Sequence, residues 1–146
     1  MLEKNVTWKD GLFLRSSFIN SDRSGSTFTN IAFDRSSMIS VNYIGATLLD
    51  VSFNSSSLIF VSFEGASLEN VITENSNFQS ISFKNAKIKN CILNGNIEEV
   101  DIRGATFENV YVNGELFTGL EENVDQGSGI EILADESGTA NNENSN

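Results

Sequence analysis

The 146-residue chain contains no histidine, no proline and only one cysteine. Without histidine it lacks the commonest general base and metal ligand, and Cys91 alone cannot form an internal disulfide. These absences exclude histidine-based catalytic triads, zinc sites and disulfide scaffolds. The absence of proline suits a lattice in which most backbone N–H groups donate hydrogen bonds.

Long apolar runs are absent as well. No stretch approaches the roughly 20 apolar residues of a membrane span, and the opening sequence MLEKNVTWKDGLF has no apolar signal core. We therefore expect a cytoplasmic protein that does not contact a membrane. Association with an assembly, or export by a non-classical route, stays open.

Basic residues are few, with 9 Lys+Arg against 20 Asp+Glu and a net charge of −11. Phosphate contacts need Lys and Arg, so a direct nucleic-acid partner is not expected. The acidity is uneven along the chain: residues 1–117 carry a net charge of −4, whereas residues 118–146 carry −7 and no base. Most of the excess charge therefore belongs to a tail.

What the chain does contain is a period of five residues. In VSFNSSSLIFVSFEGASLENV, residues 51–71, large apolar residues recur at Phe53, Leu58, Phe63 and Leu68, a spacing typical of neither a helix nor a strand. From residue 8 to residue 93, sixteen of the eighteen positions at this spacing are large and apolar. The frame then loses one residue near 94–97 and continues to Phe117.

A second series of residues lies two positions before each centre and repeats every 20 residues. One of its four columns holds only serine, and two others hold mainly β-branched residues. Residues 20 apart therefore occupy equivalent environments, which predicts stacked coils with four sides. The serine column is Ser16, Ser36, Ser56 and Ser76.

The units GATLL, GASLE, NAKIK, GATFE and SSSLI resemble the loose A(D/N)LXX pattern of the pentapeptide-repeat family, over about residues 6–117. The resemblance implies an all-β fold, a right-handed quadrilateral β-helix of about 5.5 coils, in which each centre and the residue two before it point inward. We expect this β-helix over residues 1–117. Phenylalanines 20 residues apart should then stack in columns.

Residues 118–146 are expected to form an acidic, largely disordered tail. Within it, the segment 129–134 contains Ile130, Ile132 and Leu133, which either fold back as a cap or add as a strand to a partner's sheet edge. The sequence leaves both alternatives open.

Two centres break the apolar rule, Arg23 and Thr73. The stretch NSDRSGS around Arg23 favours a bulge that turns this side chain to solvent, and the alternative is an inward Arg23 paired with Glu3. For Thr73 the favoured interpretation is a small residue that the core tolerates.

No set of residues supports catalysis, a cofactor or a metal site, so we expect no enzyme. Cys91 falls in the column of Val71 and Val110, which predicts a buried small hydrophobe rather than a nucleophile.

Large apolar residues also occur where the pattern would allow polar ones. They are Ile19, Ile39, Ile59, Phe60, Ile44 and Leu49. One interpretation is that isoleucine simply suits a pleated surface; the other is a binding or dimerisation face centred on Ile39, Ile59 and Phe60.

The sequence therefore favours a non-catalytic interaction or structural module that binds a protein partner or itself, as a component of a larger bacterial or phage assembly. The family resemblance implies an alternative, because its best-understood members mimic DNA and protect type II topoisomerases such as DNA gyrase. The small net charge of residues 1–117 and the late basic residues Lys84, Lys87 and Lys89 weaken that alternative.

Overall fold

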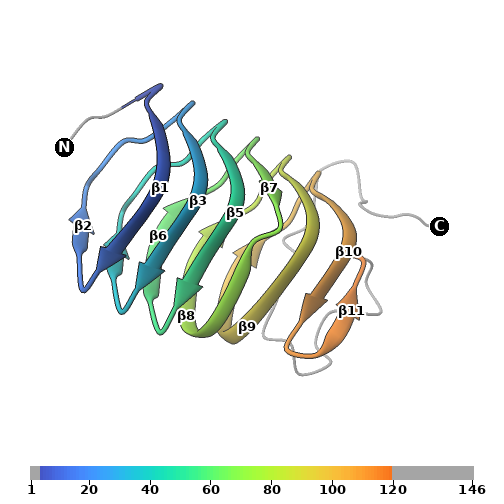
Figure 1. Cartoon of the computed structure of the whole chain (residues 1–146). Helices are drawn as coiled ribbons and strands as arrows, with labels where there is room; N and C mark the ends of the chain where they lie inside the picture. Colours follow the sequence, from blue (N-terminus) through green and yellow to red (C-terminus); the bar gives the residue numbers. More distant parts are fainter. Residues whose placement is uncertain (1–3, 120–146) are drawn as a thin grey trace.

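A computed structural model describes residues 4–119 of the chain. Within this range the backbone forms eleven strands of one sheet and no helix (Figure 1). The strands are β1 (Thr7–Leu14), β2 (Ser17–Ile19), β3 (Thr27–Asp34), β4 (Ser37–Ile39), β5 (Thr47–Asn54), β6 (Ser57–Ser62), β7 (Ser67–Glu69), β8 (Ile72–Ser82), β9 (Lys87–Asp101), β10 (Thr106–Val112) and β11 (Glu115–Phe117).

The strands stack as the rungs of a solenoid. β1 pairs in parallel with β3, and β3 with β5, so that Phe13, Phe33 and Phe53 lie opposite one another at intervals of 20 residues. On another side of the coil β2, β4, β6 and β8 pair in the same parallel manner. The result is a rod of about five turns, which confirms the expected quadrilateral β-helix.

The corners of the coil require a backbone conformation that most residues avoid. The residue two after almost every centre has a positive φ, between 51° and 59° for those that are not glycine. Asparagine and aspartate tolerate this left-handed region best, and they hold many of the corners. At one corner their side chains also pair between coils: the Asn30 amide donates to Asp10 (2.8 Å) and the Asn70 amide to Asp50 (3.1 Å).

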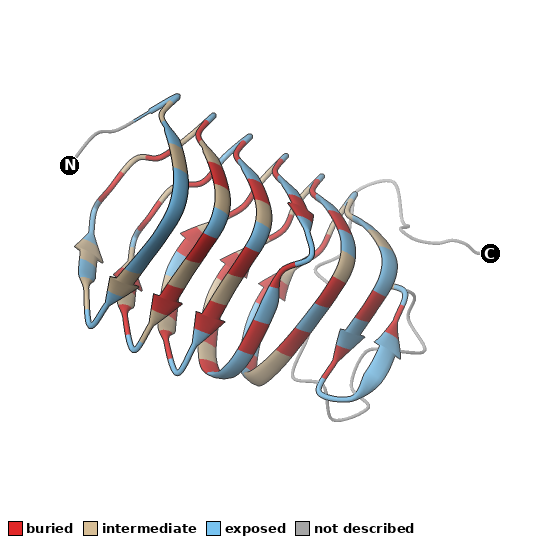
Figure 2. Cartoon of the chain, in the orientation of Figure 1, coloured by how far each residue is buried: buried red, intermediate tan, exposed pale blue. Residues whose placement is uncertain are grey.

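The core fills the inside of the coil, where buried positions alternate with half-buried or exposed ones along strands such as β3, β5 and β9 (Figure 2). Aromatic rings stack in two columns, as the period predicted. The ring centroids of Phe33 and Phe53 lie 5.0 Å apart at 6°, and those of Tyr43 and Phe63 lie 5.2 Å apart at 8°. Burial raises the pKa of the Tyr43 hydroxyl, which lies 3.4 Å from the Met38 sulfur.

The buried hydroxyls of the serine column form hydrogen bonds with backbone groups of the preceding coil. The Ser56 hydroxyl donates to the carbonyl of Phe33, one coil earlier, and accepts from the backbone N–H of Ser36 (3.1 Å). Ser36 and Ser76 make the same bonds in their own coils. Each buried hydroxyl therefore links neighbouring coils and incurs no unpaired desolvation cost.

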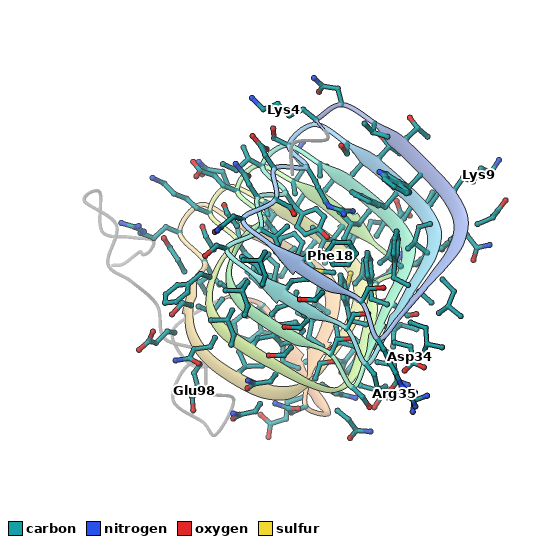
Figure 3. All side chains as sticks on the ribbon, turned by 90° about the vertical axis from the view of Figure 1, so that its left-hand side faces the viewer. Lys4, Lys9, Phe18, Asp34, Arg35 and Glu98 are labelled. Carbon is teal, nitrogen blue, oxygen red and sulfur yellow. The ribbon has the colours of Figure 1, made fainter. Side chains whose placement is uncertain are left out.

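The prediction that Arg23 faces solvent is wrong. Only 1% of the residue is exposed, and its guanidinium carbon lies 4.3 Å from the Phe18 ring centroid and 5.6 Å from that of Trp8. Viewed from the N-terminal end, Phe18 lies inside the ring of strands while Lys9 projects outward (Figure 3). The NSDRSGS stretch is an ordinary corner with its turn at Gly25, as at Gly45, and not a bulge. Glu3 lies outside the described residues.

The lost residue in the repeat appears as a change of register between β8 and β9. Thr73 pairs with Leu93 at an offset of 20, whereas Ser76 pairs with Gly95 at an offset of 19. A Cβ on Gly95 (φ 143°) would collide with the Ser76 backbone, which explains the glycine. Thr73 is more than a tolerated small residue, because its hydroxyl donates to the Asn94 carbonyl (3.0 Å) and accepts from the Asn94 N–H (2.9 Å).

The two ends of the described rod differ. At the C-terminal end the chain reverses at Asn113–Gly114, and β11 pairs antiparallel with β10. Phe117 on β11 then packs edge-on against Phe107, with centroids 4.9 Å apart. In the first coil the inward Trp8 is only half-buried, because no described strand lies before β1.

Candidate interaction surfaces

The structure brings four of the six predicted face residues together. Ile19 pairs with Ile39, and Ile39 with Ile59, so these three form one column across β2, β4 and β6. We call it the isoleucine column. Ile19 is exposed and the other two are half-buried by their neighbours in the column. Phe60 follows Ile59 directly, at the corner.

Phe60 is unusual because a large aromatic side chain stands at a corner of the coil, where it is exposed. Its side chain is 61% exposed, and its φ of 56° lies in the left-handed region. Other coils have Asn20, Ser40 and Ser80 at this corner, which are residues of smaller side chain. A bulky residue at positive φ is a genuine outlier and costs of order 1–2 kcal/mol. The fold itself does not require phenylalanine at this corner.

The residues that directly border the isoleucine column are uncharged, although Glu98 continues the column beyond Gln79 and Arg35 stands at the preceding corner. One position before the centres on the same side stand Ser37 and Ser57, and Ser40 precedes the next side. Gln79 continues the column in β8, where the apolar run ends. The surface therefore presents aliphatic and aromatic groups bordered by hydroxyls.

The two other predicted residues lie elsewhere. Leu49 pairs with Glu69 on β7 and belongs to a column on a different side, where it is half-buried. Ile44 is exposed on a third side, beside Gly45. The six residues do not therefore form one continuous patch.

Sequence reasoning missed a second apolar column. Ile72 pairs with Ile92, Ile92 with Tyr111, and Tyr111 with Leu116 of the terminal hairpin. All four side chains are 40–51% exposed. We call this row the C-terminal stripe. Reading the residue one before each centre at a spacing of 20 would have found its first two members.

The remaining titratable groups suggest no chemistry. Cys91 is buried, burial raises the pKa of its thiol, and the sulfur lies 3.2 Å from the Lys89 carbonyl. Among residues 4–119 no three Asp, Glu or Cys side chains gather as metal ligands would. No helix of the described part is long and apolar enough to cross a membrane.

The predicted tail motif, Ile130, Ile132 and Leu133, lies outside the described residues, as does nearly all of the acidic segment 118–146.

These features define a class of protein, a parallel β-solenoid whose chemically distinctive residues lie on its outer surface. Residues 56–95 match the model of the pentapeptide repeats, in eight copies. The expected resemblance to that family is therefore confirmed. No curated protein sequence matches this chain.

A solved structure of a pentapeptide-repeat protein shares the fold. The chain is similar to a pentapeptide-repeat protein, Rfr23, from the cyanobacterium Cyanothece 51142, with 16% identity, a TM-score of 0.61, and coverage of 75% of this chain and 86% of the other. Two others match less well. They are a trypsin-treated form of QnrB1, a plasmid-mediated fluoroquinolone resistance protein (15% identity, TM-score 0.32, covering 87% and 91%), and HetL of Nostoc sp. strain PCC 7120, involved in heterocyst differentiation regulation (13% identity, TM-score 0.24, covering 73% and 60%).

Proposed function

We propose that this protein is a non-catalytic interaction module whose binding surface is Phe60 together with the isoleucine column. The observation that carries the proposal is Phe60 itself, because a large aromatic residue is both solvent-exposed and held at a φ of 56°. Backbone strain that persists without benefit to packing is typical of functional positions. Aromatic residues, phenylalanine among them, are also enriched in protein interfaces.

The chemistry of this surface indicates what kind of partner surface would bind it. The aliphatic column and the Phe60 ring form an apolar surface, so the complementary surface is an apolar one on another protein or on a second copy of this chain. Because the direct neighbours of the column are serines and not charged residues, binding should depend less on salt concentration than binding through a charged surface.

The alternative of DNA mimicry receives less support from the surface charges. A phosphate mimic needs rows of acids, but the column that contains Glu69 continues with Lys89, and Arg103 lies next to Asp101. A DNA mimic should also bind in a strongly salt-dependent manner. A gyrase supercoiling assay tests it directly, and no effect at micromolar concentration would remove it.

The test of the proposal is the variant Phe60→Asn, with Ser80→Asn as the matched control at the same corner of the next coil. Asparagine already occupies this corner at position 20, so both variants should keep the far-UV CD spectrum of the fold. We expect Phe60→Asn to abolish self-association in sedimentation experiments, or capture of a partner, at both 0.1 M and about 0.5 M salt. Ser80→Asn should behave as the unaltered protein.

A double variant tests whether the isoleucine column takes part in binding. Ile39→Glu combined with Ile59→Glu should have the same effect as Phe60→Asn, since a carboxylate cannot enter an apolar interface without a desolvation cost. If association survives in both variants, Phe60 and the isoleucine column are not the binding surface.

A further inference from the structure

The C-terminal stripe offers a second apolar surface, on a different column from the isoleucine column. We propose that it is the docking site of the chain's own segment 129–134, through Ile130 and Ile132. The stripe runs across four successive strands, from β8 to β11, and ends beside the point at which the described chain ends.

The size of the stripe fits a short segment. At 40–51% exposure its four side chains present roughly 300–400 Å² of surface, whereas a stable protein interface buries about 800 Å² on each partner. An interface with a second copy would therefore need further residues around the stripe. A single extended segment of six residues covers an area of this size.

The alternation of apolar and charged residues in the segment suits an apolar surface. In an extended chain Ile130 and Ile132 share one face while Glu131 points the opposite way, so the isoleucines contact an apolar surface and the carboxylate stays in water. Leu133 and Gly129 flank this pair.

The distance is suitable too. Ten residues, 120–129, connect Gly119 to Ile130. A flexible chain of ten residues spans about 17 Å on average, and the three strand spacings of the stripe amount to about 14 Å. A linker whose average length matches the span gives an effective concentration in the millimolar range, so even a weak contact forms within one molecule.

Charge favours the stripe over the neighbouring part of the same column. Toward the N-terminus the column continues with Ser52 and Ala32, where a shallow hollow is also lined by Asp10 and Asp50. Those carboxylates repel an acidic segment. Around the stripe the charges are mixed, because Lys87 and Lys89 begin the strand that carries Ile92 whereas Glu74 follows Ile72. Residues 118–146 carry seven acids and no base.

Paramagnetic relaxation in the full-length chain tests the proposal. A spin label is attached at Ser128→Cys in a Cys91→Val background, because valine occupies the equivalent core positions 71 and 110. We expect the methyl signals of Ile72 and Ile92 to lose roughly half or more of their intensity, and those of Ile19 and Ile59 to keep theirs.

Variants separate specific docking from chance proximity. Ile130→Ser with Ile132→Ser should restore the Ile72 and Ile92 signals, whereas Val124→Ser, in the linker, should not. Ile92→Ser should likewise restore the Ile72 signal, and serine is tolerated because Ser52 stands in the same column.

Two outcomes overturn the proposal. The first is equal broadening of all four isoleucines or of none, which leaves the stripe to an external partner or to solvent. The second is broadening in a mixture of spin-labelled protein with isotope-labelled, spin-free protein, which assigns the stripe to a second copy. Neither outcome bears on Phe60, so the test is independent of the proposed function.

Discussion

The substitution Thr73→Val isolates the hydrogen bonds that hold the change of register. Valine has the shape of threonine, so the core volume stays constant while both bonds to Asn94 disappear (2.9 and 3.0 Å). The N–H and carbonyl of Asn94 then lose their partner in a half-buried site. A loss of this kind costs about 1–3 kcal/mol in unfolding free energy.

Two measurements test the predicted loss of unfolding free energy. Thermal unfolding should shift down by roughly 3–10 °C for a chain of this size. Because every 1.4 kcal/mol is a factor of ten, hydrogen exchange at the Asn94 amide should accelerate by roughly 5- to 150-fold. The matched control is Thr47→Val, an exposed strand threonine whose replacement should change stability by about 0.5 kcal/mol or less.

The reasoning is refuted if Thr73→Val and Thr47→Val are equally stable, or if exchange at Asn94 is unchanged. Either result would mean that Gly95 alone accommodates the missing residue. Solenoids can unfold in parts, so the residue-specific exchange rate is the more decisive readout.

Further predictions concern single sites. Ser56→Ala should lower the unfolding free energy by about 1–2 kcal/mol in urea titrations, because the buried N–H of Ser36 loses its acceptor. Phe60→Val should be less stable than Phe60→Asn by about 1–2 kcal/mol in the same assay, since a β-branched residue is worst at positive φ. Burial raises the pKa of the Asp101 carboxyl, but the hydrogen bonds and the charge of Arg103 lower it by more than burial raises it. The pKa of Asp101 therefore lies below its usual range. The stability that this carboxylate contributes is present above its unfolded pKa of about 3.9 and is lost as the pH falls through the lower folded value. Arg103→Gln should therefore raise the pKa of Asp101 in an NMR titration.

The period of five predicted most of the core, because each unit serves one side of a coil and the same environment returns after 20 residues. Phe33 and Phe53 stack, and Ser56 is buried with its hydroxyl bonded, as expected from their positions in the repeat. A repeat places such residues without any knowledge of long-range contacts, since the neighbouring coil always lies one period away.

The prediction that the Arg23 side chain faces solvent was wrong for a physical reason. Its polar, glycine-containing neighbourhood was interpreted as a bulge, although the corner of every coil needs a residue that accepts positive φ, and Gly45 and Gly65 serve the same role beside apolar centres. The position in the repeat predicted burial, and the charge of the residue predicted exposure. Position prevailed because the rings of Trp8 and Phe18 supply an electrostatically favourable face for a guanidinium.

The last member of the C-terminal stripe lies within the five-residue frame but outside the parallel coil. Leu116 reaches the stripe only because the chain reverses at Asn113–Gly114, and a five-residue period contains no information about reversal. The Asn-Gly dipeptide is itself a strong hairpin signal, so local turn chemistry could have supplied what the period lacked.

The two apolar surfaces differ in what the fold explains. Ile72 and Ile92 are β-branched residues in regular strands, where they suit the pleated surface, so exposure alone does not assign them to a foreign partner. Phe60 has no such explanation, because a corner disfavours it and most of its ring is in solvent. The C-terminal stripe costs the fold no stability, which fits a weak contact within the molecule. Phe60 costs the fold backbone strain, which fits a role in binding an external partner. This difference is why we assign the tail to the stripe and the partner to Phe60.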